Sequence, residues 1–285
     1  MSTADSIERE PDSCFALFDV AMETVQTRPF AGGSVAYFTT RSPDKLTANE
    51  DAIGIIPVQN SAGVLLIADG CGGQANGQLA SRMAIEAIFE LVAGYQMSTE
   101  SSAVQNSSQL RPLILDGFEI ATQRVKALGG GAATTLIALE FNQGLIRTYH
   151  AGDSQILLVG GRGKVKLQTG AHSPVGYALE SGMLTEGAAL EHEDRHLVSN
   201  VIGGGSVHIE MGLPRKMAPR DTIVLGSDGL FDNLRQAELV SMIRSGKLQQ
   251  AGENLRAKVQ SRMSGEQADG PSKPDDLSFI LFRCS

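Results

Sequence analysis

Cysteine is scarce in this sequence, and long apolar runs are absent from it. The three cysteines, Cys14, Cys71 and Cys284, are odd in number and lack the spacing of a metal site, which favours a reducing cytoplasm. No stretch approaches the roughly 18 consecutive apolar residues that a membrane-spanning helix needs. The acidic, polar N-terminus is not typical of a signal peptide. We therefore expect a cytoplasmic protein that does not interact with a membrane.

Basic residues are also in deficit. The chain has 24 Lys and Arg against 32 Asp and Glu, which gives a formal net charge of −8. This balance argues against nucleic acid or an anionic membrane as the main partner. It is compatible with sites that gather divalent cations.

The length and composition indicate one globular unit. The chain has 285 residues, 42% of them hydrophobic and 20% charged, as in an ordinary soluble protein with one well-buried core. The sequence lacks internal repeats and low-complexity segments. We expect residues 1–13 to form a loose tail and residues 14–285 to form a single domain.

Short apolar strands alternate with two pairs of amphipathic helices along the chain. Helical spacing occurs in residues 79–91 (Leu79, Met83, Ala87 and Leu91), 114–128, 235–244 and 248–263. Strands are predicted at residues 18–22, 34–40, 64–68, 134–141, 145–150, 156–159, 164–167, 222–226 and 277–282. Residues 170–210 follow no regular pattern. Hairpin connections with helices in pairs favour antiparallel sheets covered by helices over a Rossmann-type sheet.

Four acidic clusters stand at the edges of apolar strands. Asp69-Gly70 and Asp228-Gly229 each follow an apolar run, and the glycine lets the backbone turn where the strand ends. Glu50-Asp51 and Asp275-Asp276 each precede another apolar run. Oxygen ligands without His or Cys favour hard cations, Mg²⁺ or Mn²⁺ rather than Zn²⁺. The clusters together therefore predict a metal site.

Each of these motifs alone is also typical of ordinary structure. Asp-Gly pairs are common turn residues, and Asp275-Asp276 alone fits a solvated loop. Gly152-Asp153-Ser154 fits a hairpin turn, and Asp232 fits the N-cap of a helix after Phe231. The prediction depends on the ordered set rather than on any single motif.

Five motifs occur in the order found in the metal-dependent serine/threonine phosphatases of type 2C. They are residues 49–52, 68–73, 152–154, 226–232 and 275–278. Residues 171–203 are also similar to the flap segment of the bacterial members. The chain thus resembles that family from about residue 18 to residue 282, which is nearly its whole length.

The resemblance implies an α+β fold and a metal centre. The fold would be a four-layer α-β-β-α sandwich, in which two antiparallel sheets are flanked by helix pairs, with a flap near residues 170–210. Two Mn²⁺ or Mg²⁺ ions would lie at one end of the sandwich, as in the family. A third, weaker ion is seen in bacterial relatives.

The same resemblance implies roles for individual residues. Asp69 would bridge the two ions, and the Gly70 carbonyl would bind the second ion. Asp228 and Asp275 would hold the first ion, and Asp69 and Asp228 are the residues on which catalysis should depend. Glu50 and Asp51 would act directly or through bound water, and Asp153 would hold the third ion.

Two positions depart from the family pattern. Many members carry an Arg that binds the substrate phosphate where Leu46 stands here. Lys45 would replace it only if a bulge turned its side chain, because adjacent residues of a strand face opposite ways; otherwise it is solvated surface. Cys71 stands where eukaryotic members carry a His proposed to protonate the leaving group. We interpret Cys71 as a buried small side chain, because a thiol is a poor acid for this step.

Two other motifs are similar to signatures of different protein classes. Residues 192–196 match the zinc-protease signature H-E-x-x-H, with Glu210 as a candidate third ligand. They lie in a charged stretch of the expected flap, which disfavours the buried helix that such a site needs. The glycine run 129–131 lacks the Lys-Ser/Thr ending of a phosphate-binding loop and follows a helix, which disfavours a kinase or ATPase.

We therefore predict a hydrolase that removes phosphate from Ser and Thr of proteins, with a metal-activated water as nucleophile. Its partners would be phosphoprotein substrates of an opposing Ser/Thr kinase, and we expect a monomer that binds no nucleic acid. The alternative is a catalytically silent module of the same fold that binds a phosphoprotein. The residues at positions 46 and 71 favour this alternative, and the intact carboxylates disfavour it.

Overall fold

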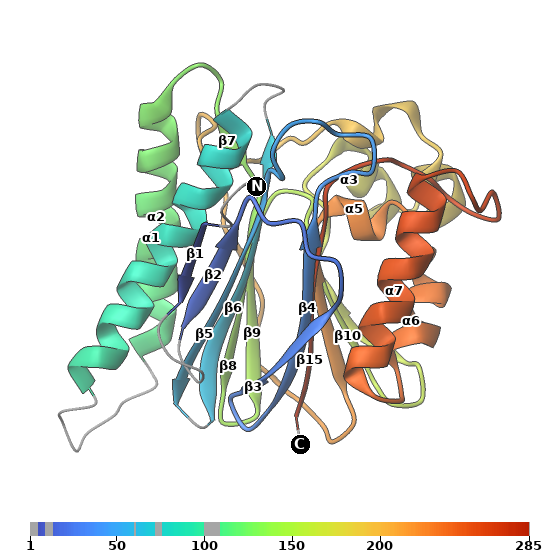
Figure 1. Cartoon of the computed structure of the whole chain (residues 1–285). Helices are drawn as coiled ribbons and strands as arrows, with labels where there is room; N and C mark the ends of the chain where they lie inside the picture. Colours follow the sequence, from blue (N-terminus) through green and yellow to red (C-terminus); the bar gives the residue numbers. More distant parts are fainter. Residues whose placement is uncertain (1–4, 9–13, 60, 72–75, 100–108, 285) are drawn as a thin grey trace.

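Two antiparallel β-sheets lie face to face in the middle of the molecule (Figure 1). The computed structural model describes residues 5–8, 14–59, 61–71, 76–99 and 109–284. The larger sheet has the order β1-β2-β5-β6-β8-β9-β12, with β7 beside β6 and β13 beside β9. Its strands are β1 (Asp5–Glu8), β2 (Phe15–Phe18), β5 (Asp51–Gln59), β6 (Ala62–Cys71), β7 (Ala133–Thr134), β8 (Leu136–Asn142), β9 (Leu145–Ala151), β12 (Glu210–Met211) and β13 (Arg215–Lys216).

The smaller sheet has the order β11-β10-β14-β15-β4-β3. Its strands are β3 (Gln26–Phe30), β4 (Gly33–Thr40), β10 (Gln155–Val159), β11 (Val165–Gln168), β14 (Thr222–Gly226) and β15 (Leu277–Cys284). The last strand, β15, lies between β14 and β4. This pairing brings the C-terminal part of the chain beside its N-terminal part.

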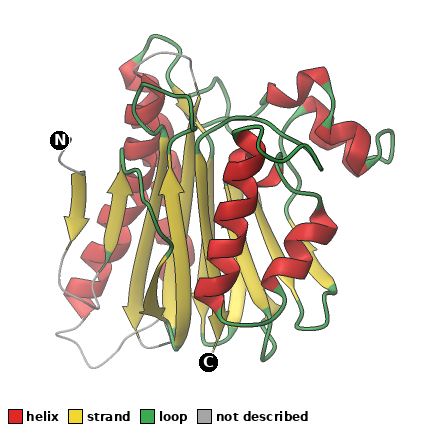
Figure 2. Ribbon diagram, turned by 45° about the vertical axis from the view of Figure 1, so that its right-hand side comes forward, coloured by secondary structure: helices red, strands yellow, loops and turns green. Residues whose placement is uncertain are grey.

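A pair of helices covers the outer face of each sheet (Figure 1, Figure 2). Helices α1 (Asn76–Thr99) and α2 (Leu110–Leu128) pack on the larger sheet, and α6 (Gln236–Ile243) and α7 (Leu248–Met263) pack on the smaller one. Three apolar clusters fill the spaces between these four layers. The predicted α-β-β-α sandwich is therefore confirmed. Among the described residues, none of the helices combines the length and apolar character needed to span a membrane.

The N-terminal region differs from the sequence expectations. The alternation at residues 18–22 predicts a strand, but β2 ends at Phe18, and Asp19 has a positive φ of 52°. Residues Asp5–Glu8, expected in a loose tail, form β1 and pair with β2. The rest of that expected tail, residues 1–4 and 9–13, lies outside the described part of the chain.

Helix α1 presents a different face to the sheet than its apolar spacing suggested. Ala80, Ala84, Ile85, Ile88 and Val92 are fully buried, and so is Ala87 of the predicted face, whereas Leu79 is 38% exposed. The buried face is therefore wider than the predicted one and centred beside it, with Met83 and Leu91 half-buried at its edge. The apolar stripe of α1 is wide, so spacing alone does not fix which side meets the sheet.

The segment 170–210, called the flap below, contains three short helices instead of irregular structure alone. They are α3 (Pro174–Glu180), α4 (Glu186–Leu190) and a 3₁₀ helix at Glu193–His196. Ser173 caps α3 by accepting a hydrogen bond from the Gly176 N–H at 2.9 Å. The capped helices give the flap a defined shape at one end of the sandwich (Figure 1).

The strand registers bring the acidic motifs to that same end. Asp51 begins β5 and is the cross-strand partner of Asp69 in β6. In the smaller sheet, Gly226 at the end of β14 pairs with the first residue of β10 and with a residue near the start of β15. The motifs of residues 152–154, 226–232 and 275–278 therefore meet.

Candidate metal centre

Asp69 and Asp51 stand side by side on a fixed backbone. Directly opposed residues of an antiparallel pair place their side chains on the same face of the sheet. The Asp69 N–H donates to Thr135 Oγ1 at 3.0 Å, and its carbonyl accepts from the Thr135 N–H at 2.8 Å. A Cβ on Gly70 would lie 2.2 Å from a neighbouring carbonyl oxygen. Only glycine therefore fits directly after Asp69.

Lys273 gathers three carboxylates from the other sheet. Its Nζ contacts Asp228 and lies 3.1 Å from Asp232 Oδ2 and 3.3 Å from Asp275 Oδ2. Burial alone would lower the pKa of the Lys273 ammonium, but the negative charges of Asp228, Asp232 and Asp275 outweigh burial and raise it. Sequence reasoning missed Lys273; its position two residues before Asp275 is the signal that would have pointed to it.

Asp232 belongs to this cluster, so its prediction as a helix N-cap is wrong. It follows α5 (Asp228–Phe231), and its N–H donates to the Asp228 carbonyl at 2.7 Å. The N-cap of the next helix is Arg235. Residues four apart on a helical turn lie on the same face, so α5 presents Asp228 and Asp232 together. Asp232 is a further candidate ligand.

Ser227 ties the Asp51 carboxylate to the smaller sheet. Its hydroxyl donates to Asp51 Oδ2 at 2.9 Å and accepts from the Ser278 N–H at 3.1 Å. Asp51 of the larger sheet is thereby tied to the ends of β14 and β15 in the smaller one.

Glu50 lies beside the centre with Lys45 and Asp276. The Lys45 Nζ is 2.5 Å from Glu50 Oε2 and 2.6 Å from Asp276 Oδ2. Asp276 also accepts from the backbone N–H groups of Ser42 and Glu50, at 2.8 Å and 2.7 Å. Residues 41–50 form a loop, so the strand geometry assumed for Lys45 does not apply and its side chain turns inwards without a bulge. Leu46 is 96% exposed.

Asp153 enters the centre from the turn between β9 and β10. Gly152 has a φ of 116°, and a Cβ there would lie 2.5 Å from the Thr135 side chain. The hydroxyls of Ser154 and Thr135 share a hydrogen bond of 2.7 Å. Because Thr135 also holds Asp69, it fixes Asp153 and Asp69 relative to each other.

The carboxylates of this centre repel one another. Burial raises the pKa of Asp69 well above its usual range, and the charges of Asp51, Asp228, Asp275 and Asp153 raise it further. Burial, with repulsion from Asp228, raises the pKa of Asp153 to about 8 and that of Asp275 to about 7. A cation bound among these groups would favour their ionised forms.

The donor set fits hard divalent cations. Asp51 Oδ1 and Asp228 Oδ1 are buried and accept no hydrogen bond from the residues that the structure describes. Buried anionic oxygens without a donor are costly unless they are paired with a cation. Carboxylate and carbonyl oxygens are the ligands that Mg²⁺ and Mn²⁺ prefer.

The metal-free protein should lose stability as the pH rises. A carboxyl group whose pKa is raised on folding binds more protons when folded than when unfolded, so stability falls between its two pKa values. The window runs from the unfolded value of about 3.9 up to the folded values of about 6, 7 and 8 for Asp232, Asp275 and Asp153. In EDTA, scanning fluorimetry should give a lower melting temperature at about pH 8 than at about pH 5.5.

Saturating Mn²⁺ should remove most of this difference, and Asp153→Asn should reduce it in EDTA. A metal-free melting temperature that rises over the same interval would contradict the assignment of raised pKa values to these groups.

The zinc-protease motif is not assembled. His196 is the last residue of a short 3₁₀ helix, and His192 is its N-cap. The His192 Nδ1 accepts a hydrogen bond from the Asp194 N–H at 3.1 Å. Glu210, the candidate third ligand, instead lies 3.3 Å from His172 and 3.8 Å from His150. The structure therefore contradicts the protease hypothesis.

Cys71 ends β6, with its Sγ 3.6 Å from the Asp69 carbonyl oxygen. Burial raises the pKa of the Cys71 thiol well above its usual range, and the surrounding aspartates raise it further. The thiol is therefore protonated at neutral pH. Cys71 was predicted to be a buried small side chain, and it is half-buried in the structure.

The sandwich and its acidic centre are compatible with a metal-dependent hydrolase, and comparisons identify the family. The family model described as protein phosphatase 2C matches residues 44–261. A relative from Streptococcus pyogenes, named putative protein phosphatase 2C-type, is 29% identical over 207 residues, 70% of this chain and 80% of its own length. Protein phosphatase PhpP of Streptococcus pneumoniae is 28% identical over 216 residues, with the same coverage. The chain belongs to the protein phosphatase 2C family, a family of serine/threonine phosphatases.

Solved structures share the fold. The serine/threonine phosphatase of S. agalactiae superposes with a TM-score of 0.73 at 24% identity and covers 88% of this chain and 99% of its own. Stp1 of Staphylococcus aureus gives 0.71 at 19% identity, with 98% and 100% covered. The catalytic domain of PstP in complex with two manganese ions gives 0.65 at 22% identity, with 91% and 99% covered.

Proposed function

We propose that this chain hydrolyses phosphoserine and phosphothreonine in proteins, using two Mn²⁺ or Mg²⁺ ions bound at its acidic centre. The observation that carries the proposal is the convergence of carboxylates from both sheets, in which one buried oxygen each of Asp51 and Asp228 has no donor in the described part of the chain. Family membership supports the reaction class, and the description of PstP with two manganese ions supports the metal count.

We propose for each ligand the role that the family resemblance implies. Asp69 would bridge the two ions, the Gly70 carbonyl would bind the second, and Asp228 and Asp275 would hold the first. Glu50 and Asp51 would support these ligands, and Asp153 would hold a third ion. We add Asp232, because it shares Lys273 with Asp228 and Asp275.

When bound, such an ion pair supplies a water of lowered pKa and neutralises charge on the phosphoryl oxygens. The chain's own residues fix the ligands: Thr135 holds the Asp69 backbone, and Ser227 orients the Asp51 carboxylate. Cys71 is not a nucleophile in this scheme, because its raised pKa keeps it as a thiol. Lys45 is the candidate for phosphate binding, since its ammonium already lies at the edge of the centre beside Glu50.

The direct test is turnover by protein stripped with EDTA and then supplied with a single cation. We expect hydrolysis of p-nitrophenyl phosphate and of a phosphothreonine peptide after addition of Mn²⁺ or Mg²⁺ and none in EDTA. A phosphotyrosine peptide should react much more slowly. The proposal would be refuted if the protein with Mn²⁺ hydrolysed neither the phosphothreonine peptide nor p-nitrophenyl phosphate.

Calorimetry separates the proposal from the silent module. Mn²⁺ binding without turnover would favour a module that binds a phosphoprotein, whereas no Mn²⁺ binding would contradict the metal centre itself. The partners proposed for the enzyme are phosphoproteins modified by a Ser/Thr kinase. We propose that it acts as a monomer, which size-exclusion chromatography with light scattering checks.

A further inference from the structure

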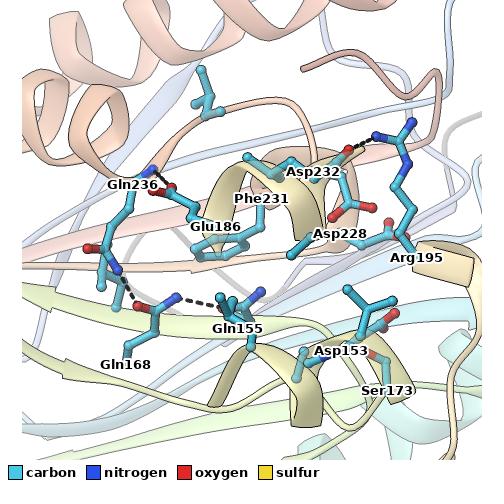
Figure 3. Close-up of a pocket in the computed structure, with 18 of the residues that line it drawn as sticks. Asp153, Gln155, Gln168, Ser173, Glu186, Arg195, Asp228, Phe231, Asp232 and Gln236 are labelled. Carbon is cyan, nitrogen blue, oxygen red and sulfur yellow. Dashed lines mark hydrogen bonds between the residues drawn. The ribbon is translucent and has the colours of Figure 1, made fainter. Parts of the chain in front are cut away.

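A pocket of about 330 Å³ opens beside the acidic centre, between the flap and the smaller sheet (Figure 3). Asp153, Asp228 and Asp232 line one end, and Gln168 and Gln236 line the other. We call it the flap pocket. Because it shares three carboxylates with the acidic centre, any group in it lies beside the place where a phosphate would react.

Apolar side chains form the wall between these two ends. They come from β10, the flap helices and the segments α5 and α6: Leu157, Val175, Leu179, Ala189, Phe231 and Leu239. Most of them are buried, and Leu179, at 40% exposure, stands at the rim. The volume is near the lower limit for ligand sites in proteins, which suits one large side chain rather than a whole helix.

The far end of the flap pocket is closed by amide groups that satisfy one another. The Gln168 side-chain amide donates to Gln155 Oε1 at 2.9 Å, and the Gln236 amide donates to Gln168 Oε1. The Gln236 backbone N–H donates to Glu186 Oε1. This end therefore offers no cation to an acidic group, and Glu186 would repel one.

The flap side of the pocket is held in place. A Cβ on Gly176 would lie 2.2 Å from the Ala171 carbonyl oxygen, so α3 packs tightly on its own approach segment. Arg195 donates to the Leu190 carbonyl and, at 2.9 Å, to the Ser272 carbonyl. The second bond ties the flap to the loop that carries Lys273. The pocket is thus formed before a ligand arrives, which lowers the entropic cost of binding.

We propose that the flap pocket receives a large apolar side chain, such as Leu, Met or Phe, from the substrate segment that flanks the phosphorylated Ser or Thr. The inference rests on the proposed function and deepens it by naming a class of substrate. Burial of such a side chain removes apolar surface from water. Discrimination by an apolar pocket of this kind is on the order of tenfold or more in kcat/KM.

Phosphothreonine peptides in a Gly/Ser host test the proposal. A single Leu is moved through the positions from three residues before to three residues after the phosphothreonine, and kcat/KM is measured with Mn²⁺. We expect one position at which Leu raises kcat/KM by about tenfold over the host and Asp does not. Equal kcat/KM for every peptide in the series would overturn the proposal.

Two variants locate the effect in the flap pocket. Ala189→Leu fills the pocket and should lower kcat/KM for the Leu peptide to that of the Gly/Ser host peptide. Ala188→Leu, on the exposed side of the same helix, is the matched control and should keep the preference. Leu179→Ala widens the rim and should shift the preference towards Phe. The assignment would be contradicted if the Leu preference survived Ala189→Leu. It would also be contradicted if this variant lowered kcat/KM equally for the Leu peptide and for the Gly/Ser host peptide.

Failure of the proposed function gives a different result. Wild-type protein would then hydrolyse neither p-nitrophenyl phosphate nor any peptide. The flap pocket is in that case judged from fluorescence polarisation with labelled Leu and Gly/Ser peptides. Tighter binding of the Leu peptide, lost in Ala189→Leu but kept in Ala188→Leu, would support the pocket, and equal binding would overturn it.

Discussion

Asp69→Asn should lower kcat for p-nitrophenyl phosphate in saturating Mn²⁺ by about 10³-fold or more, as expected when charge stabilisation of the transition state is removed. Asp69 is the position at which the charges of both sheets act together, since Asp51, Asp153, Asp228 and Asp275 all raise its pKa in addition to burial. Asn keeps the shape of the side chain but presents one oxygen and no negative charge. The measurement is steady-state kinetics over a range of Mn²⁺ concentrations.

The melting temperature in EDTA shows whether a loss of activity reflects unfolding. Because Asp69 is repelled by its neighbours in the metal-free protein, Asp69→Asn should raise that temperature by about 2 °C or more, the effect of roughly 1 kcal/mol in a domain of this size. The stabilisation by added Mn²⁺ should shrink. Asp116→Asn, on the exposed side of α2, is the matched control and should change neither property. Activity within tenfold of wild type would contradict the central role of Asp69.

The layers of the fold were predictable because each element has its own local signal. The glycines after residue 128 mark the end of α2, and residues 248–263 were predicted as a helix with the bounds that α7 has. The strand at 18–22 failed because alternation of Phe18, Val20 and Met22 does not show where backbone pairing stops. Pairing of β15 between β14 and β4 depends on contacts between distant segments, which local patterns do not contain.

The carboxylates of the acidic centre were predictable because they lie near strand ends. The places of Lys273 and Asp232 in the centre were not predictable. Asp69 and Asp228 follow short apolar runs, so their location near strand ends follows from the sequence. Lys273 lies in an irregular loop without a pattern, and its contacts depend on how that loop folds over α5. Asp232 fits a helix cap equally well from its neighbours alone. The flap pocket lies between α3, α4 and α6. Local sequence patterns do not predict how these separate segments pack, so the pocket could not be predicted.

Lys273→Met should strengthen Mn²⁺ binding by at least about tenfold, which corresponds to about 1.4 kcal/mol. The ammonium contacts Asp228 and lies 3.3 Å from Asp275, so it occupies the space between two proposed ligands of the first ion. At roughly 4 Å and an effective dielectric constant of 20, a divalent ion and an ammonium repel each other by about 8 kcal/mol. The side chain must therefore leave before an ion of this charge binds between the two carboxylates.

Met keeps the length of the Lys273 side chain without its charge, and calorimetry of Mn²⁺ binding measures the difference. In EDTA, Lys273→Met should also melt at a lower temperature, because Asp228, Asp232 and Asp275 then repel one another without the ammonium between them. Lys247→Met, an exposed position before α7, provides the matched control for loss of one positive charge. Unchanged or weaker Mn²⁺ binding in Lys273→Met, with the control unchanged, would contradict competition between this ammonium and the metal. Lys273 would then be a support of the occupied centre rather than a competitor of the metal.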